Sequence, residues 1–219
     1  MREWENATWA SGRSEQAVIR QAGLAVARHA ELLTRPGGGV LVCAGKGHNG
    51  DDALVAAEAL LHAGRQVRVL RVEAPETAVR QLEPLLAQRP ELILDGLFGI
   101  GLNRPLAADW LAFIQAINQA GFPILAVDAP SGLSAQTGLP QTEAIRATYT
   151  ITLGAVKDGL LKSSAWSYVG RLAVAPEIGL VPCPFATDLN YLTADDFRAF
   201  PPPRPVAGHK GSFGHLAII

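Results

Sequence analysis

Cysteine is scarce in this chain of 219 residues. Its two cysteines, Cys43 and Cys183, lie far apart and belong to no C-x-x-C pair or Cys/His cluster, so the sequence contains no structural zinc motif. Cys43 lies inside an apolar run, where we expect a buried structural thiol. This usage is typical of a reducing compartment, and we predict a cytoplasmic protein.

Long apolar runs and a charge of one sign are also missing. No stretch approaches the roughly 20 apolar residues of a membrane-spanning helix, and the first six residues do not open a secretion signal. The formal net charge of −1 gives neither nucleic acid nor an anionic membrane an electrostatic reason to bind. A G-x-x-x-x-G-K-[ST] loop is absent, which argues against a P-loop NTPase.

Helical and strand-like segments alternate along most of the chain. Apolar residues at helical spacing predict helices, and short continuous apolar runs predict strands that are buried on both faces. We therefore expect an α/β protein with a three-layer Rossmann-like fold, in which a mostly parallel sheet carries helices on both faces. The expected helices are 14–33, 52–63, 77–88 (with Pro84 as a break) and 107–119, and the expected strands are 40–44, 66–72, 92–95, 124–128, 149–153 and 171–174.

The C-terminal part differs from the rest. Residues 200–208 contain Phe-Pro-Pro-Pro-Arg-Pro, which fits neither a helix nor a central strand, so we predict a linker there. Residues 209–219 resemble a turn followed by a new strand. We therefore predict one domain over residues 1–199 and the truncated start of a second domain over 209–219.

Three loops follow strands of the predicted sheet and carry most of the chemistry. The first is Gly45-Lys-Gly-His-Asn-Gly-Asp-Asp52, the second runs from Asp95 to Pro105, and the third is Asp128-Ala-Pro-Ser-Gly132. Glycines in the first loop let backbone N–H groups approach an anion at a helix N-terminus. A plain tight turn would also explain them.

The loops share one edge of the sheet, because the carboxyl ends of parallel strands meet there. Open α/β sheets bind their ligands at this edge. Asn49, Asp95, Asp128 and Ser131 would bring hard oxygen atoms into one crevice. Such a group of oxygens fits either a cation site or an acid/base site.

The loops resemble those of the NAD(P)H-hydrate epimerases, the YjeF N-terminal domain family. The first loop is similar to G-x-G-N-N-G-G-D-G, the second to D-A-L-F-G-T-G-x-x-R-P-L, and the third to D-x-P-S-G-L-x-x-x-x-G. The segment from Thr148 to Gly154 with Lys157 is also similar, so the resemblance covers roughly Ser14 to Leu180. It implies an isomerase that interconverts the R and S forms of hydrated NADH and NADPH.

The resemblance also implies a role for each site residue and several partners. Asp128 would be the acid/base group, and a potassium ion would be held by Asn49, Asp95 and Ser131. The family suggests a homodimer, and the tail His209 to His215 resembles the opening of an ADP- or ATP-dependent NAD(P)H-hydrate dehydratase domain, a lyase. The substrate-binding residues would be His48, Asn49, Gly50, Asp51, Asp52, Gly99, Ile100, Gly101, Leu102, Asn103, Arg104, Pro105 and Asp128.

The first loop departs from the family pattern at three positions. His48 replaces Asn, whereas Asp51 and Ala53 replace Gly. Asp51 puts a carboxylate where phosphates would approach the helix, and like charges about 4 Å apart repel by roughly 4 kcal/mol at a surface-like dielectric. We therefore predict weaker substrate binding than in a typical family member.

Two other functions fit parts of the sequence. A catalytically inactive binding or scaffold module of the same fold would tolerate the altered first loop, although it would not need Asn49, Asp95 and Ser131 together. An NAD-dependent oxidoreductase would fit G-x-G-x-x-G, with Glu73 as the acid about 20 residues further on. That alternative leaves the Asp128 loop unexplained.

Overall fold

The computed structural model describes residues 1–102, 104–186, 190–200, 206–208 and 211. The chain forms two compact units, Met1–Pro184 and Phe185–Ile219. The second unit contains one short 3-10 helix, η3 (Ala194–Phe197), among its described residues. Most of the predicted linker and of the predicted second-domain start lies outside the described residues, so that division remains a prediction.

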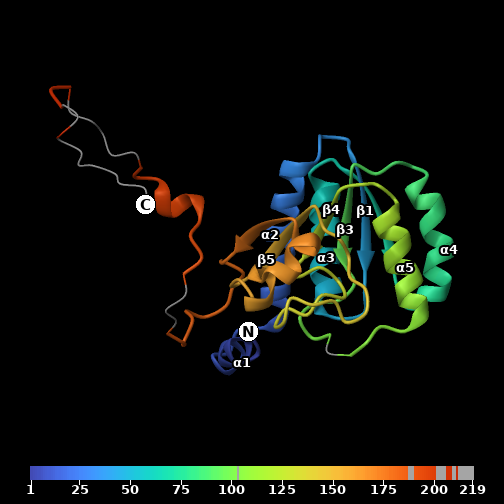
Figure 1. The fold of residues 1–219 in the computed structure, drawn as a ribbon, viewed down its shortest axis with the longest axis horizontal. Coiled ribbons are helices and arrows are strands. Elements are labelled where there is room, and N and C mark those ends of the chain that lie inside the picture. The colour runs from blue at the N-terminus through green and yellow to red at the C-terminus, as the bar shows by residue number, and fades with distance from the viewer. Residues whose placement is uncertain (103, 187–189, 201–205, 209–210, 212–219) are drawn as a thin grey trace. The chain divides into compact units, whose positions relative to one another are not determined.

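The first unit is built on a parallel sheet of six strands, as the sequence predicts (Figure 1). The strands lie in the order β2-β1-β3-β4-β5-β6, and every neighbouring pair is parallel. Because the chain moves from β1 outward to β2 and then returns to the other side of β1, the connection reverses direction between β1 and β3. The strands are β1 (Gly39–Ala44), β2 (Gln66–Arg71), β3 (Leu92–Gly96), β4 (Ile124–Val127), β5 (Tyr149–Leu153) and β6 (Arg171–Ala175).

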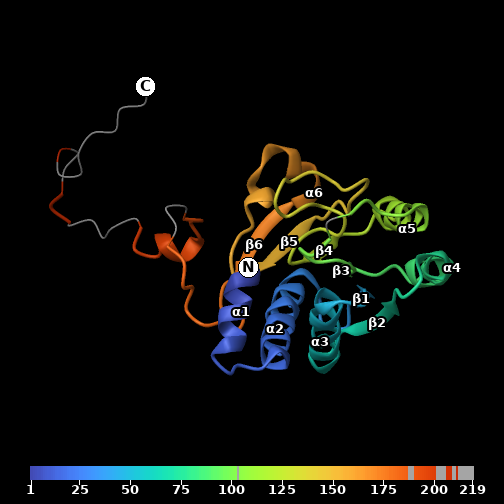
Figure 2. The same ribbon diagram turned by 90° about the horizontal axis from the view of Figure 1, so that it is seen from below.

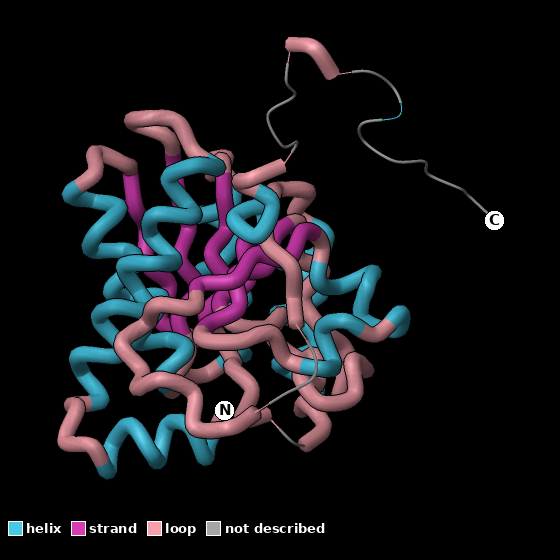
Figure 3. The backbone as a smooth tube through the Cα atoms, turned by 90° about the vertical axis from the view of Figure 1, so that its left-hand side faces the viewer, coloured by secondary structure: helices cyan, strands magenta, loops and turns pink. Residues whose placement is uncertain are grey.

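Helices cover both faces of this sheet, which confirms the predicted three layers (Figures 2 and 3). One face packs on α2 (Glu15–Leu33) and α3 (His48–His62), and the other on α4 (Pro75–Leu86) and α5 (Ala108–Gln119). Val40 and Val42 of β1 join the first core, whereas Leu41 and Cys43 join the second. This alternation explains why β1 is apolar throughout, since both of its faces are buried. Cys43 is buried as expected.

Local signals explain where several helices begin. Ser14 caps α2, because its side chain accepts a hydrogen bond from the backbone N–H of Ala17 at 3.2 Å. Pro84 does not break α4, which continues to Leu86. The prediction for α3 was wrong at its start: this helix begins at His48 rather than Asp52, so the second half of the glycine-rich segment is helical. No described helix is both long and apolar enough to cross a membrane.

Four helices were not expected from the sequence. They are the N-terminal helix α1 (Arg2–Ala10) and the short helices after β5, η1 (Asp158–Leu161), η2 (Ser163–Ala165) and α6 (Trp166–Val169). Long-range hydrogen bonds hold α1 in place. The Trp4 indole N–H donates to the Val181 carbonyl at 2.7 Å, and the Val181 N–H donates to Thr8 Oγ1 at 3.3 Å. These bonds bring the first residues of the chain to the carboxyl edge of the sheet.

Helix α3 packs on β3 through an unusually close contact. A Cβ on Gly96 would lie 2.4 Å from the Ala53 Cβ and 2.9 Å from the Asn49 carbonyl oxygen. Only glycine therefore fits at position 96 while alanine occupies position 53. In the family pattern these two residue types are exchanged, with alanine after the aspartate of β3 and glycine in the helix.

We predict that Ala53 and Gly96 are energetically coupled. Gly96→Ala should lower the free energy of unfolding by about 1–3 kcal/mol through overpacking, and Ala53→Gly should lower it by about 1 kcal/mol through helix propensity. The double variant should lose less than the sum of the two, by at least about 0.5 kcal/mol. Urea unfolding of the four proteins measures this coupling, and strict additivity would contradict the contact.

Candidate functional site

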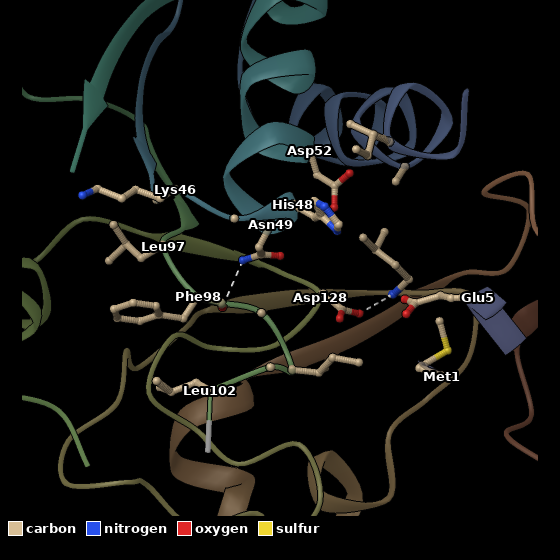
Figure 4. Close-up of a pocket in the computed structure, with 18 of the residues that line it drawn as sticks. Met1, Glu5, Lys46, His48, Asn49, Asp52, Leu97, Phe98, Leu102 and Asp128 are labelled. Carbon is tan, nitrogen blue, oxygen red and sulfur yellow. Dashed lines mark hydrogen bonds between the residues drawn. The ribbon is translucent and has the colours of Figure 1, made fainter. Parts of the chain in front are cut away.

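The carboxyl edge of the sheet contains a cavity of about 880 Å³ (Figure 4). Its walls come from the segments that follow β1, β3 and β4, together with parts of α1, α2 and the segment after β6. The reversal between β1 and β3 lies at this edge, and open α/β sheets bind ligands at such a point. The volume falls within the range of about 300–1,000 Å³ that is typical of small-molecule sites.

The three glycines of the first loop have different roles. A Cβ on Gly45 would lie 2.0 Å from the Leu97 carbonyl oxygen, and a Cβ on Gly50 would lie 2.1 Å from the Gly45 carbonyl oxygen. These two glycines therefore let the loop, α3 and the β3 loop pack closely. Gly47 is the N-cap of α3, lines the cavity and has open space where a side chain would be. The helix N-terminus thus faces the cavity without a side-chain cap.

The structure brings most of the predicted substrate-binding residues to the cavity wall. Gly50, Asp51 and Pro105 do not line it, and Asn103 lies outside the described residues. The residues that line it are His48, Asn49, Asp52, Gly99, Ile100, Gly101, Leu102, Arg104 and Asp128.

Two of the unusual residues in the first loop differ in their relation to the cavity, since His48 lines it and Asp51 does not. The His48 side chain is 70% exposed, and its Nε2 lies 2.9 Å from Glu15 Oε1 on α2. Asp51 is partly exposed on the first turn of α3 and does not line the cavity. The premise that Asp51 faces incoming phosphates is therefore not met by its position.

A buried hydrogen-bond network joins the three residues predicted to bind potassium. The Ser131 hydroxyl donates to Asp95 Oδ1 at 2.6 Å, and the Ser131 N–H donates to Asp95 Oδ2 at 2.8 Å. The Phe98 N–H donates to Ser131 Oγ at 2.9 Å, while the Asn49 amide donates to the Phe98 carbonyl at 3.0 Å. This network connects the β4 loop, the β3 loop and α3.

Asp95 is fully buried and has no basic partner among the residues that the structure describes. Burial raises the pKa of its carboxyl to about 6, although the hydrogen bonds from Ser131 and Leu97 lower it. The Asp95 carboxylate, the Ser131 hydroxyl and the Phe98 carbonyl bring hard oxygen atoms together, and the Asn49 amide joins them through its nitrogen. These ligands suit a monovalent cation, and no group of three or more His, Cys, Asp or Glu side chains in the described residues forms a metal cluster.

Asp128 follows β4 and forms a buried ion pair with Lys157. Its Oδ1 accepts hydrogen bonds from Lys157 Nζ and from the Leu153 N–H, the latter at 2.9 Å. Lys157 Nζ also donates to Thr152 Oγ1 at 3.0 Å and to the Leu153 carbonyl at 2.7 Å, so all three of its protons have acceptors. Asp128 has a φ of +65°, a left-handed conformation that aspartate tolerates better than most residues.

The opposite wall of the cavity carries a second buried carboxyl, Asp52. It is 7% exposed, and none of the hydrogen bonds between described residues involves its carboxyl oxygens, which are accessible from the cavity. Gly23 of α2 permits this placement, since a Cβ there would lie 2.6 Å from the Asp52 carbonyl oxygen. Burial raises the pKa of Asp52 to about 8, and the charges of Asp128, Asp51 and Glu5 add to this effect while Lys157 opposes it.

Sequence reasoning gave no site role to several residues that line or support the cavity. Lys157 lies 29 residues from Asp128 in the sequence, and no local signal indicated that the two side chains would form an ion pair. Glu73 follows β2 and lines the cavity, as the oxidoreductase alternative required. The other lining residues without a predicted role include Met1, Glu5, Trp9, Glu15, Phe98 and Trp110.

Comparison with known proteins gives the chain a family. The family model described as "YjeF-related protein N-terminus" matches residues 15–87 and 72–159. An NAD(P)H-hydrate epimerase of Achromobacter xylosoxidans is 41% identical, and the match covers 69% of this chain and 79% of that protein.

Longer relatives and one solved structure extend the likeness. The "Bifunctional NAD(P)H-hydrate repair enzyme Nnr" of Gloeobacter violaceus is 34% identical and that of Coxiella burnetii 35%; the matches cover all of this chain but only 48% and 49% of those proteins. The chain thus spans about half the length of these two relatives. The crystal structure of yeast YNL200c has a similar fold, with a TM-score of 0.55 and 24% identity over 74% of this chain and 79% of that one. The chain therefore belongs to the YjeF-related N-terminal domain family.

Proposed function

We propose that this chain is an NAD(P)H-hydrate epimerase, which interconverts the R and S forms of hydrated NADH and NADPH. The names of its relatives and the loops at the cavity support this proposal. No observation favours the scaffold or the oxidoreductase over it. We also propose that the full-length protein is a cytoplasmic homodimer with a C-terminal dehydratase domain; the bifunctional relatives support the second domain.

The observation that carries the proposal is the buried Asp128–Lys157 pair at the cavity wall. A scaffold would have no use for a charge pair there, because removing charges from water costs several kcal/mol for each ion. Asp128 Oδ1 is held by Lys157 and by the Leu153 N–H, whereas Asp128 itself lines the cavity. Lys157 thus orients an acid/base carboxyl toward a bound substrate.

The proposed reaction requires acid/base chemistry at C6 of the hydrated nicotinamide ring. A proton delivered to the C6 hydroxyl lets it leave as water, while the lone pair of the ring nitrogen forms a double bond to C6. Water then adds to C6 and returns a proton to a carboxylate. We assign the acid/base chemistry at C6 to Asp128.

The anionic part of the substrate would bind at the other end of the cavity. Gly47 and the uncapped N-terminus of α3 offer backbone N–H groups, and Lys46 and Arg104 both line the same cavity. Phosphate groups are favoured at helix N-termini, because the helix dipole and the free N–H groups act together.

A potassium ion would be held by oxygens of Asn49, Asp95 and Ser131, three residues that hydrogen bonds link directly or through the Phe98 carbonyl. Such an ion would neutralise the buried carboxylate of Asp95 and hold the three loops together. Its chemistry is electrostatic, since a monovalent cation attracts oxygen atoms and carries out no redox step.

We predict that Asp128→Asn lowers the epimerisation rate about 10²- to 10⁴-fold, the usual contribution of a general acid/base group. The variant leaves Lys157 unpaired, so its folded fraction must be measured first by circular dichroism. Chromatographic separation of the two epimers over time gives the rate. Asp109→Asn on the exposed first turn of α5 is the matched control and should keep the wild-type rate. A folded Asp128→Asn variant with full activity would remove Asp128 from the mechanism.

We also predict that potassium stabilises the protein more than choline does at equal ionic strength. A cation that binds only the folded chain raises the free energy of unfolding, and the melting temperature should rise by about 2–4 °C for each kcal/mol gained. Asp95→Asn should abolish this difference, whereas Asp109→Asn should preserve it. Equal melting temperatures in both salts, or an effect that survives Asp95→Asn, would count against the ion.

A further inference from the structure

We propose that Asp52 is a second catalytic residue, and that Asp52 and Asp128 serve opposite faces of the hydrated ring in a two-base epimerisation. This inference rests on the proposed function. It concerns a residue whose expected role was substrate binding alone, and it follows from the arrangement of the two carboxyls around the cavity.

Asp52 and Asp128 reach the cavity from different parts of the fold. Asp52 projects from the second turn of α3, and Asp128 follows β4, so the two carboxyls come from different walls. Both line the same cavity, and in Figure 4 Asp52 on the helix lies across from Asp128 near the strand end. A flat ring placed between them would present one face to each carboxyl.

Asp52 and Asp128 also differ in their hydrogen bonding. Asp128 shares one oxygen with Lys157 and Leu153, so its negative charge is balanced inside the fold. Asp52 has no such partner among the described residues: it is 7% exposed, and its carboxyl oxygens are accessible from the cavity. A buried carboxyl without a partner holds a proton more readily than a paired one. The resting site therefore contains one proton donor and one proton acceptor.

The charged groups around Asp52 act in the same direction. Glu5 of α1, Asp51 of α3 and Asp128 all favour a protonated Asp52, and Lys157 is the basic group that opposes them. His48 is turned toward Glu15. The pKa of Asp52 is raised to about 8, so this carboxyl carries a proton at neutral pH.

The two carboxyls complete an inversion with balanced atoms and charges. Asp52 gives its proton to the C6 hydroxyl on its side, the C6–O bond breaks with its electrons leaving on water, and the ring nitrogen lone pair forms the N1=C6 bond. A second water attacks the opposite face of C6, loses a proton to Asp128 and returns the electrons to nitrogen. The site is reset when the proton passes from Asp128 to Asp52 through solvent, or when the opposite epimer reacts in reverse.

Epimerisation in ¹⁸O-labelled water tests this mechanism directly. The wild-type protein should invert C6 and incorporate the label. Asp52→Asn and Asp128→Asn should each lower the inversion rate at least about 10²-fold relative to the wild type, after the rate of an enzyme-free control has been subtracted. Asp128→Asn should still exchange the C6 oxygen with retention, because the protonated Asp52 can expel a hydroxyl on its own side and take the proton back when water adds there. Asp52→Asn lacks the proton donor of the resting site and should lose this exchange as well.

The outcomes separate this inference from the proposed function. A wild-type protein that does not invert C6 overturns the proposed function. A wild-type protein that inverts C6, together with an Asp52→Asn variant that inverts it within a few-fold of that rate, overturns only the role of Asp52. Exchange by Asp52→Asn at the rate of Asp128→Asn also overturns it, since the proton that expels the hydroxyl would then not come from Asp52. Asp109→Asn is the control for loss of one exposed carboxylate.

The stability of Asp52→Asn gives an independent prediction. With a folded pKa of about 8 against an ordinary value of 3.8, the folded wild-type protein binds more protons than the unfolded chain between these values. The stability that Asp52 contributes is therefore present at low pH and lost as the pH rises toward 8. We therefore expect the free energy of unfolding of Asp52→Asn, minus that of the wild type, to increase as the pH rises from 5 to about 8 in urea unfolding. A constant difference would show that Asp52 does not hold its proton.

Discussion

The buried carboxyl of Asp95 is the point on which the site depends. It accepts two hydrogen bonds from Ser131, and Ser131 in turn joins Phe98, whose carbonyl accepts the Asn49 amide. Segments that follow three different strands are thereby held in one arrangement. Without this network, the loops would be connected only through the strands that precede them, and the cavity walls would not be fixed relative to one another.

This arrangement concentrates negative charge, and the proposed chemistry explains why the fold tolerates it. Loss of hydroxide from a hydrated nicotinamide ring leaves a positive charge on the ring, which nearby carboxylates stabilise in a water-poor cavity. The phosphates of the proposed substrate would need the opposite environment, for which the uncapped N-terminus of α3 is suited. The acidic side chains that line the cavity are Glu5, Glu15, Asp52, Glu73 and Asp128, and the basic ones are Lys46 and Arg104.

The sequence predicted the elements whose signals are local. The apolar run of β1 and the Ser14 cap of α2 needed no knowledge of the fold. It predicted less where long-range contacts decide the structure. The first turn of α3 was predicted as a loop because glycine disfavours helices. Gly50 is nevertheless helical, and glycine is required there because a Cβ would collide with the Gly45 carbonyl oxygen. Lys157 and α1 gave no local signal, because their partners lie far along the chain.

The altered first loop shows why departures from a family pattern cannot be judged one position at a time. Ala53 adds a methyl group on α3 where the family pattern has glycine. A methyl group is correspondingly absent from β3, where Gly96 stands in place of the alanine of that pattern. The helix and the strand thus keep their separation with the methyl group on the other partner. His48 finds Glu15 at the edge of the site, and Asp51 lies outside the cavity. What these substitutions preserve is the position of Asn49 and Asp52, because both residues are carried by the turns of α3 that the Ala53–Gly96 contact sets against the sheet.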